Sequence, residues 1–316
     1  MAKMAQRAQL QPTDAPQGRS WLRRACYVLL AVVLLAAVIV GSVAWYGADQ
    51  AIHPKQNSYT WKLSDFPNLK AEPVTVRTTD GVSLAGRFFP GGSKATIVLS
   101  HGYGGDQDQM IPYADFLNRA GYSVLTCDMR QRGQSGGDAV TFGAAEQNDL
   151  VSVVDYLSAR PDVDPNRIGA LGISMGGATT VLAAAKDPRI KVVVEDSGYS
   201  DVANVIATSF ESFVPIPAFP FAPVTVKIVE WRTGYNVNDI RPVDVVSRIS
   251  PRPIFIIHGT ADKDVRPPNG QRLFDAALNP RQIWWAQGAH HVEARALYPA
   301  EYAQRVVQFF NQWLKT

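Results

Sequence analysis

The stretch Leu-Gly-Ile-Ser-Met-Gly-Gly at residues 171–177 constrains this chain most, because it places a serine between glycines where an apolar run ends and a helical pattern begins. The preceding run, 167–173, is typical of a buried strand, and the small residues that follow are typical of a helix packed closely on a sheet. The glycines remove Cβ atoms that would clash in a sharp strand-to-helix turn. We interpret the stretch as a nucleophile elbow that exposes Ser174 above a sheet; a glycine-rich turn without chemistry is the alternative.

Strand and helix patterns alternate along most of the chain. Asp80-Gly81 separates two alternating runs, 74–78 and 84–89, and predicts a hairpin. Further strands are predicted at 95–100, 123–127, 167–173, 191–196, 253–258 and 282–286. Helices are predicted at 109–120, 145–160, 175–186, 269–278 and 299–315. This order predicts an α/β fold with a mostly parallel central sheet and helices on both faces.

The N-terminal region carries an uncharged stretch, 25–48, that is long enough to cross a hydrocarbon core of about 30 Å as a helix. Five basic residues and one acidic residue precede it, so the positive-inside rule predicts a cytoplasmic N-terminus. We predict a retained single-pass anchor in the cell membrane with the rest of the chain outside. The alternative is a secreted protein, because Ser42-x-Ala44 resembles a signal-peptide cleavage site.

The predicted domain order follows from these boundaries. Residues 1–24 form a cytoplasmic basic segment, 25–48 the transmembrane anchor, 49–72 a juxtamembrane connector and 73–316 the main domain. Trp45 and Tyr46 suit the far membrane interface. Residues 199–250 exceed an ordinary connection, which predicts an inserted cap.

The centre of the predicted cap combines aromatic residues with prolines. Phe210, Phe213, Phe219 and Phe221 are the candidates to line an apolar substrate pocket. Two other interpretations remain open: the aromatic side chains touch the bilayer, or they pack the cap onto the sheet.

Composition excludes several partners. The net charge is +3, but the excess of basic residues lies in the first 24 positions and the remainder is close to neutral. The sequence has no nucleic-acid motif, no phosphate-binding glycine loop and no paired Cys-x-x-Cys, so nucleic acid, nucleotides and structural zinc are not expected. Cys26 in the apolar stretch and Cys127 at a strand end are too separate to predict a disulfide.

A serine hydroxyl needs a base within hydrogen-bond reach and a carboxylate that orients the base. The sequence has five histidines: His53, His101, His258, His290 and His291. The first lies beside the apolar stretch, and the next two precede glycines at strand ends, where they suit turns. The adjacent pair follows the last predicted strand, at the edge where ligands gather in such folds. We predict His291 as the base, with His290 as the alternative.

The predicted acid is Asp262, which follows the strand 253–258 at the same edge of the sheet. Asp264 and Asp196 are the alternatives. The order Ser174, Asp262, His291 is the chain order expected after a nucleophile elbow.

An oxyanion hole needs two backbone donors. The elbow supplies the N–H of Met175. The glycine-rich loop 101–105 allows the Tyr103 N–H to be the second donor, although a tight turn without a ligand is the alternative.

From about residue 74 onward, the chain resembles the α/β-hydrolases, in particular their prolyl-oligopeptidase-like and serine-aminopeptidase-like branches. The motifs that carry the resemblance are His-Gly-Tyr-Gly-Gly at 101–105, Asp-Met-Arg-Gln-Arg-Gly-Gln-Ser at 128–135, Gly-Ile-Ser-Met-Gly-Gly at 172–177, His-Gly-Thr-Ala-Asp at 258–262 and Gly-Ala-His-His at 288–291. The resemblance implies ester, thioester, amide or peptide hydrolysis without a metal or organic cofactor. It also implies a structural or pocket-forming role for loop 128–135, in which Gln131 departs from the usual pattern.

These observations together predict a membrane-anchored serine hydrolase of acyl esters. A peptidase is the first alternative, although no acidic site for a substrate amino terminus is assigned. A non-catalytic protein that uses the cap to bind a partner or lipid is the second alternative.

Overall fold

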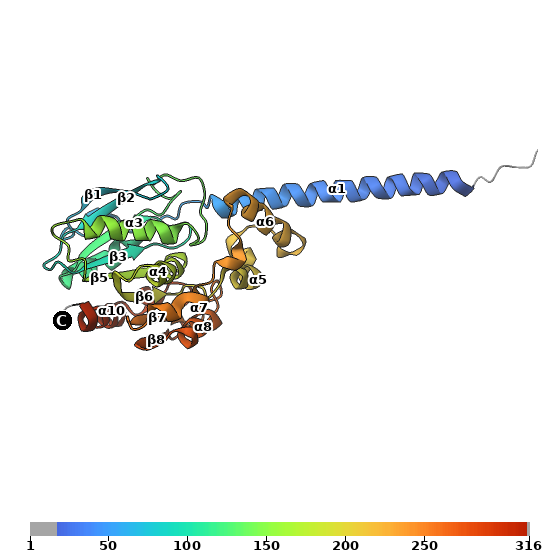
Figure 1. The fold of residues 1–316 in the computed structure, drawn as a ribbon. Coiled ribbons are helices and arrows are strands. Elements are labelled where there is room, and N and C mark those ends of the chain that lie inside the picture. Colours follow the sequence, from blue (N-terminus) through green and yellow to red (C-terminus); the bar gives the residue numbers. More distant parts are fainter. Residues whose placement is uncertain (1–17, 315–316) are drawn as a thin grey trace, which may run out of the picture.

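The computed structural model describes residues 18–314 of the 316-residue chain, apart from the side chains of residues 18, 19 and 213. Figure 1 shows a central sheet surrounded by helices, from which the long helix α1 (Gly18–Ile52) projects. The predicted cytoplasmic segment, 1–24, lies mostly outside the described residues.

The sheet has eight strands in the order β1-β2-β4-β3-β5-β6-β7-β8. Only β1 and β2 run antiparallel to their neighbours, so the predicted α/β fold with a mostly parallel sheet is confirmed. The strands are β1 (Glu72–Arg77), β2 (Ser83–Phe89), β3 (Thr96–Ser100), β4 (Ser123–Cys127), β5 (Ile168–Ile173), β6 (Ile190–Asp196), β7 (Ile254–Gly259) and β8 (Arg281–Ala286).

Helices cover both faces of this sheet. On β3, Ile97 and Leu99 pack on one face together with α2 (Ile111–Arg119) and α10 (Pro299–Leu314). Val98 points to the other face, toward α3 (Glu146–Ser158), α4 (Met175–Lys186) and α8 (Pro268–Ala276). Successive strand residues face opposite sides of the sheet. A continuously apolar strand therefore packs against helices on both faces. Short helices complete the body: η1 (Leu63–Asp65), η2 (Gln107–Met110) and α9 (Ala294–Leu297).

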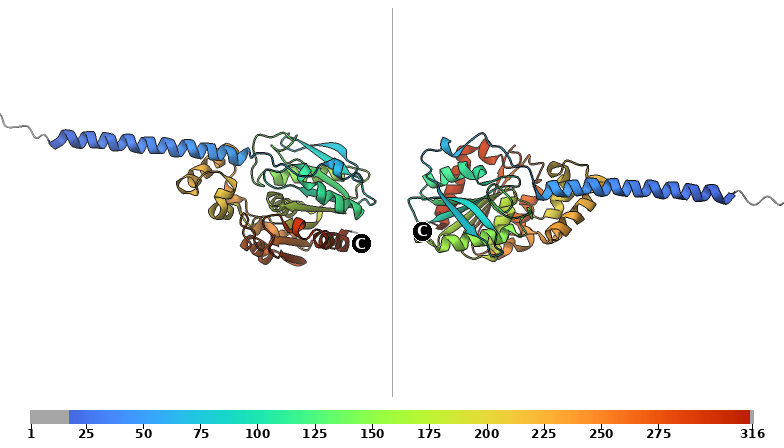
Figure 2. Two further views of the ribbon diagram at one scale, coloured as in Figure 1. Left: turned by 180° about the vertical axis from the view of Figure 1, so that it is seen from behind. Right: turned by 90° about the horizontal axis from the view of Figure 1, so that it is seen from above.

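A helical cap connects β6 to β7. It consists of α5 (Val202–Phe213), α6 (Ala218–Thr233), η3 (Val237–Asp239), α7 (Pro242–Val245) and η4 (Val246–Ile249). Figures 1 and 2 show α5 and α6 beside the C-terminal end of α1, where they project from the body. Ala44 and Ala48 of α1 are fully buried at this junction, which joins the cap to the N-terminal helix.

Helix α1 differs from the predicted span in length. One helix among the described residues, Ser20–Ile52, is long and apolar enough to cross a membrane, as an anchor or a signal sequence would be. The helix continues past Ala48, and its last turn is tied to the body because Ile52 O accepts a hydrogen bond from Val140 N at 2.9 Å.

Candidate active site

Ser174 occupies the single residue between β5 and α4. Its backbone has φ 53° and ψ −124°. Residues other than glycine rarely adopt this conformation, so the surrounding structure must impose it. The Ser174 N–H donates to Asp196 O at 2.8 Å, which fixes the turn to β6. A Cβ atom at Gly176 would overlap Ser100 O, so only glycine allows α4 to approach β3 this closely. The predicted strand, sharp turn and helix are therefore all present.

The side chain of Ser174 lies at one end of a chain of hydrogen bonds. Its Oγ is 2.8 Å from His291 Nε2, and His291 Nδ1 is 2.8 Å from Asp262 Oδ2. A carboxylate accepts from Nδ1–H, which leaves Nε2 as an acceptor for the serine proton. This arrangement can activate a serine hydroxyl as a nucleophile.

Asp262 is rigidly held at the end of β7. Its side chain is fully buried, and Oδ1 accepts backbone N–H groups from Asp264 at 3.0 Å and Val265 at 2.9 Å. Oδ2 is thereby directed at His291. His258 lies nearby, with Nε2 3.7 Å from Asp262 Oδ2 and 2.8 Å from Val265 O, and burial lowers its pKa. His258 thus supports the loop that carries the acid.

The alternative residues occupy other positions. His290 Nδ1 contacts Ala261 O at 3.1 Å, and Asp264 contributes its backbone N–H to Asp262. Asp196 accepts hydrogen bonds from Ser197 Oγ at 2.8 Å and Tyr302 OH at 2.9 Å. Burial raises the pKa of Asp196 to about 6, and these partners make it a support of the β6 end.

Glu195 is a buried acid that the sequence analysis did not single out. It is fully buried next to the elbow and accepts the Gly198 N–H through Oε1, and none of residues 18–314 provides a hydrogen-bond partner for Oε2. Burial raises its pKa to about 8. The sequence signal that marks it is a carboxyl directly after the apolar run 192–194 of a predicted buried strand, because an acidic side chain is almost never fully buried unless it is paired.

The glycine-rich loop 101–105 lies against the elbow. A Cβ atom at Gly102 would be 3.3 Å from Ser174 Cβ, so the backbone that leads to Tyr103 runs beside the serine. Met175 is the first residue of α4, where amide N–H groups lack partners within the helix. The two predicted oxyanion donors therefore come from segments that flank Ser174.

His101 holds this loop in place. Its Nδ1 is 2.8 Å from Gly102 O, and its Nε2 accepts Met129 N–H at 2.9 Å. Burial lowers the His101 pKa to about 4, so the ring is neutral at pH 7 and can donate at one nitrogen while it accepts at the other.

Comparison with known proteins shows the family of this chain. Residues 111–316, more than half of the chain, match the prolyl oligopeptidase family. The chain belongs to this family. The fold and the family place it among the α/β-hydrolases. Its structural neighbours indicate that it belongs to the serine hydrolase superfamily.

Several relatives of this family member are uncharacterized bacterial proteins. YqkD of Bacillus subtilis is 25% identical over 252 residues, covering 79% of this chain and 82% of its own length. A Mycobacterium tuberculosis protein is 27% identical over 278 residues, covering 86% and 91%. Among solved structures, an esterase from Pyrococcus furiosus is 26% identical with a TM-score of 0.69, covering 83% of this chain and 99% of its own. An acylaminoacyl peptidase from Pyrococcus horikoshii shares the fold at 18% identity and a TM-score of 0.61, covering 78% and 42%.

Loop 128–135 of this hydrolase has structural contacts. Asp128 accepts hydrogen bonds from the N–H groups of Gln107 at 2.7 Å and Gln134 at 2.9 Å. Arg132 donates to Gly104 O at 2.9 Å and to Pro54 O at 2.6 Å, which joins the connector after α1 to the glycine-rich loop. Gln131, the departure from the family pattern, adopts a φ of 64° at the turn.

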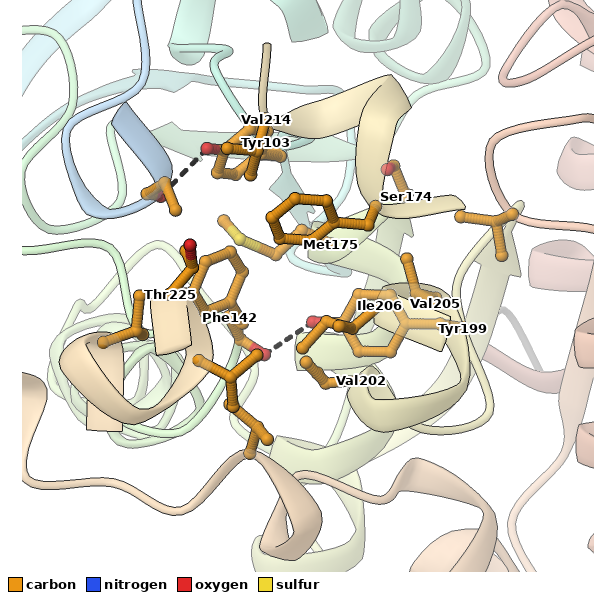
Figure 3. Close-up of a pocket in the computed structure, with 16 residues that line it drawn as sticks. Tyr103, Phe142, Ser174, Met175, Tyr199, Val202, Val205, Ile206, Val214 and Thr225 are labelled. Carbon is orange, nitrogen blue, oxygen red and sulfur yellow. Dashed lines mark hydrogen bonds between the residues drawn. The ribbon is translucent and has the colours of Figure 1, made fainter. Parts of the chain in front are cut away.

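An apolar cavity opens beside Ser174, and its empty volume is about 740 Å³ when the space open to solvent is included. Figure 3 shows Tyr103, Phe142 and Tyr199 around it. The two tyrosine hydroxyls are turned to backbone carbonyls, at 2.9 Å to Ala51 O and 2.5 Å to Phe142 O, so the rings present their carbon atoms to the cavity. No charged residue is among the described lining residues.

The four cap phenylalanines of the sequence prediction have different positions. Phe210 lines the cavity. Phe219 is 87% exposed, and neither it nor Phe221 is among the described lining residues. The described lining thus supports the pocket prediction for Phe210 but not for Phe219 or Phe221. The side chain of Phe213 lies outside the described residues.

The cavity is lined mainly by residues that the sequence analysis did not name. They include Val205, Val214, Thr225, Val226 and Val229 of the cap and Ala51 of α1. Small residues recur along the end of α1 at positions 44, 47, 48 and 51, a spacing that indicates close helix packing and was the available signal. Among residues 18–314, no group of three or more His, Cys, Asp or Glu side chains is arranged to hold a metal ion.

Proposed function

We propose that this protein is a serine hydrolase that cleaves acyl esters through an acyl-enzyme intermediate. The observation that carries the proposal is the hydrogen-bonded order Ser174, His291, Asp262, with 2.8 Å at each contact, at the mouth of an apolar cavity.

The proposed reaction has two halves. Ser174 Oγ attacks the acyl carbonyl while His291 Nε2 takes its proton, and the N–H groups of Tyr103 and Met175 stabilise the oxyanion. The tetrahedral intermediate collapses, and the alcohol leaves with the proton from His291. Water then attacks the acyl-enzyme with His291 as base, which releases the acid and regenerates Ser174. Asp262 orients His291 and stabilises its charged form throughout.

The lining of the cavity favours esters with an apolar acyl group. Aliphatic and aromatic side chains surround the space, and the described lining offers no carboxylate for a substrate amino terminus. The Pyrococcus furiosus neighbour is an esterase, which supports the same choice. A peptidase remains the second candidate, because the family takes its name from an oligopeptidase.

We also propose that α1 is a retained single-pass anchor, with the N-terminus in the cytoplasm and the catalytic domain outside the cell membrane. The fully buried Ala44 and Ala48 support retention, because the end of α1 forms part of the packed domain. Protease digestion of intact cells tests this topology, and protection of the domain would contradict it.

Labelling with a fluorophosphonate tests the nucleophile. The folded wild-type protein should label and Ser174→Ala should not. Absence of labelling in folded wild type would favour the non-catalytic alternative. Acyl esters compared with aminoacyl amides then separate the two enzymatic candidates: turnover of amides alone would contradict the esterase proposal.

A further inference from the structure

The depth of the domain in a membrane follows from helix length. A hydrocarbon core of about 30 Å requires about 20 helical residues at 1.5 Å each. Counted from the charged Arg24, this length ends near Ala44, the first residue of α1 that is fully buried by the cap. The exposed Trp45 and Tyr46 follow directly, as expected for side chains at a membrane interface. The cap therefore begins where the membrane ends.

Helix α6 runs in the same direction as α1 along this junction. Thr225 Oγ1 donates to Ala44 O at 3.4 Å, and Arg232 donates to Asp49 at 2.9 Å further along both helices. The rings of Trp231 and Trp45 lie between these contacts, 6.0 Å apart. The part of α6 that precedes Thr225 continues along α1 past Ala44, where Gly41 and Val43 are partly buried, whereas Val214 and Ile216 lie against Gly47. Figure 1 shows this part of the cap projecting from the body alongside α1.

The segment placed at that depth suits a lipid environment. Residues 214–226 contain no charged residue and lie between Glu211 and Lys227, and we call residues 218–224, which precede Thr225, the cap tip. Phe219 at the tip is 87% exposed and Trp231 at the interface is 73% exposed. Aromatic side chains exposed to this degree on one side of a domain, next to an apolar helix, indicate contact with a bilayer.

The cavity reaches the same junction. Val214, Thr225 and Val226 of the cap line it, and so does Ala51, which lies seven residues beyond Ala44 in α1. Ser174 lines it from the hydrolase body. The cavity thus extends from the nucleophile to Thr225, which is hydrogen-bonded to Ala44 at the proposed membrane boundary.

We propose that the cap tip inserts beside α1 into the leaflet that faces the domain, and that the cavity receives the acyl chain of an ester dissolved in that leaflet. The choice of substrate rests on the proposed esterase activity, whereas insertion of the cap tip does not. In this arrangement a long acyl chain passes from lipid into an apolar cavity without crossing water, and the ester carbonyl stops at Ser174.

Site-specific labels test the insertion without reference to activity. Full-length protein with Cys26→Ser is reconstituted in phosphatidylcholine vesicles and labelled with a polarity-sensitive fluorophore at Phe219→Cys or, as a matched control, at Leu278→Cys. Leu278 is also an exposed apolar residue, at 56%, but lies on the body after α8. We expect brominated lipids to quench the label at 219 and aqueous iodide to quench the label at 278.

Two outcomes would overturn the insertion. The label at 219 would be quenched by iodide as strongly as the label at 278 if the tip were in water. It would resist both quenchers if a second protein covered the tip.

Kinetics test the substrate class. With Phe219→Asp, turnover of a long-chain ester held in vesicles should fall about tenfold or more, because a carboxylate opposes insertion. Turnover of a water-soluble butyrate ester should keep the wild-type rate, and Leu278→Asp should change neither substrate. A wild-type protein that hydrolyses no ester would contradict the proposed function, whereas equal turnover of vesicle-held ester by wild type and Phe219→Asp would contradict lipid entry alone.

Discussion

The sheet edge and the junction between α1 and the cap are held together by different kinds of interaction. At the sheet edge, Asp262 is fully buried and accepts two backbone N–H groups besides His291. At the junction, Ala48 and Ala51 pack with apolar side chains of the cap such as Val214. Directional hydrogen bonds fix atoms to within fractions of an ångström, which proton transfer needs. Apolar packing has no direction, so it suits the binding of a variable acyl chain.

The largest effect is expected where the polar geometry is broken. Asp262→Asn should lower kcat by about 10⁴-fold, because the amide favours the wrong tautomer of His291. Asp264→Asn is the matched control, since its backbone N–H and not its carboxylate supports Asp262, and it should lower kcat by no more than a few-fold. Ester turnover by both purified variants measures this. An equal loss of kcat in the two variants would contradict the assignment of Asp262 as the acid.

A change in the cavity should alter selectivity rather than chemistry. Val226→Phe fills part of the lining, so the ratio of long-chain to acetyl ester turnover should fall about tenfold, since each excluded methylene is worth about 0.8 kcal/mol. Val224→Phe places the same ring on α6 at a position that is not among the described lining residues. Rates for esters of graded length distinguish them. An unchanged ratio in Val226→Phe would show that the acyl chain binds elsewhere.

Glu195 should make the body sensitive to pH. Its pKa is raised from 4.5 to about 8, so between these values the folded state keeps a proton that the unfolded state loses. Stability should therefore fall as the pH rises, by about 1.4 kcal/mol per pH unit at most. Glu195→Gln cannot ionise and should flatten this dependence, making the variant more stable than wild type at pH 8. Thermal midpoints in detergent from pH 5 to 8 measure the slope.

Glu301→Gln, at a half-exposed pair on α10, is the control and should keep the wild-type slope. A wild-type slope in Glu195→Gln as well would mean that Glu195 is ionised in the folded protein at neutral pH.

The smallest effect is expected at the polar rim of the junction. Arg232 pairs with Asp49 at 2.9 Å and lies over the Trp45 ring at 5.3 Å, in a partly exposed position. Arg232→Ala should lower the free energy of unfolding by about 1 kcal/mol or less, because exposed pairs are weakened by solvent. Arg241→Ala, which removes a surface pair with Asp244, is the control. The resistance of the cap to proteolysis is measured for both variants. Equal resistance would show that Arg232 does not stabilise the junction.

Much of the body was predictable because its signals are local. The strand patterns and the hairpin at Asp80-Gly81 nearly coincide with the observed elements, since the turn lies between the paired Arg77 and Ser83. The contact of Ser174 with His291 followed from motif order and from the rule that parallel strands end at one edge. The positions of Phe219 and Phe221 were not predictable, because the direction of a side chain depends on how α6 packs.

The alternation of strands and helices, the apolar N-terminal stretch and the residue types at the candidate site could all be predicted from the sequence, because periodicity, charge and glycine placement act over a few neighbours. Three features required the packed structure: the end of α1 lines the cavity, Glu195 is fully buried and its Oε2 has no partner among residues 18–314, and α6 lies beside α1. These features join residues far apart in the chain, such as Ala44 and Thr225. Their environments exist only once the chain has packed.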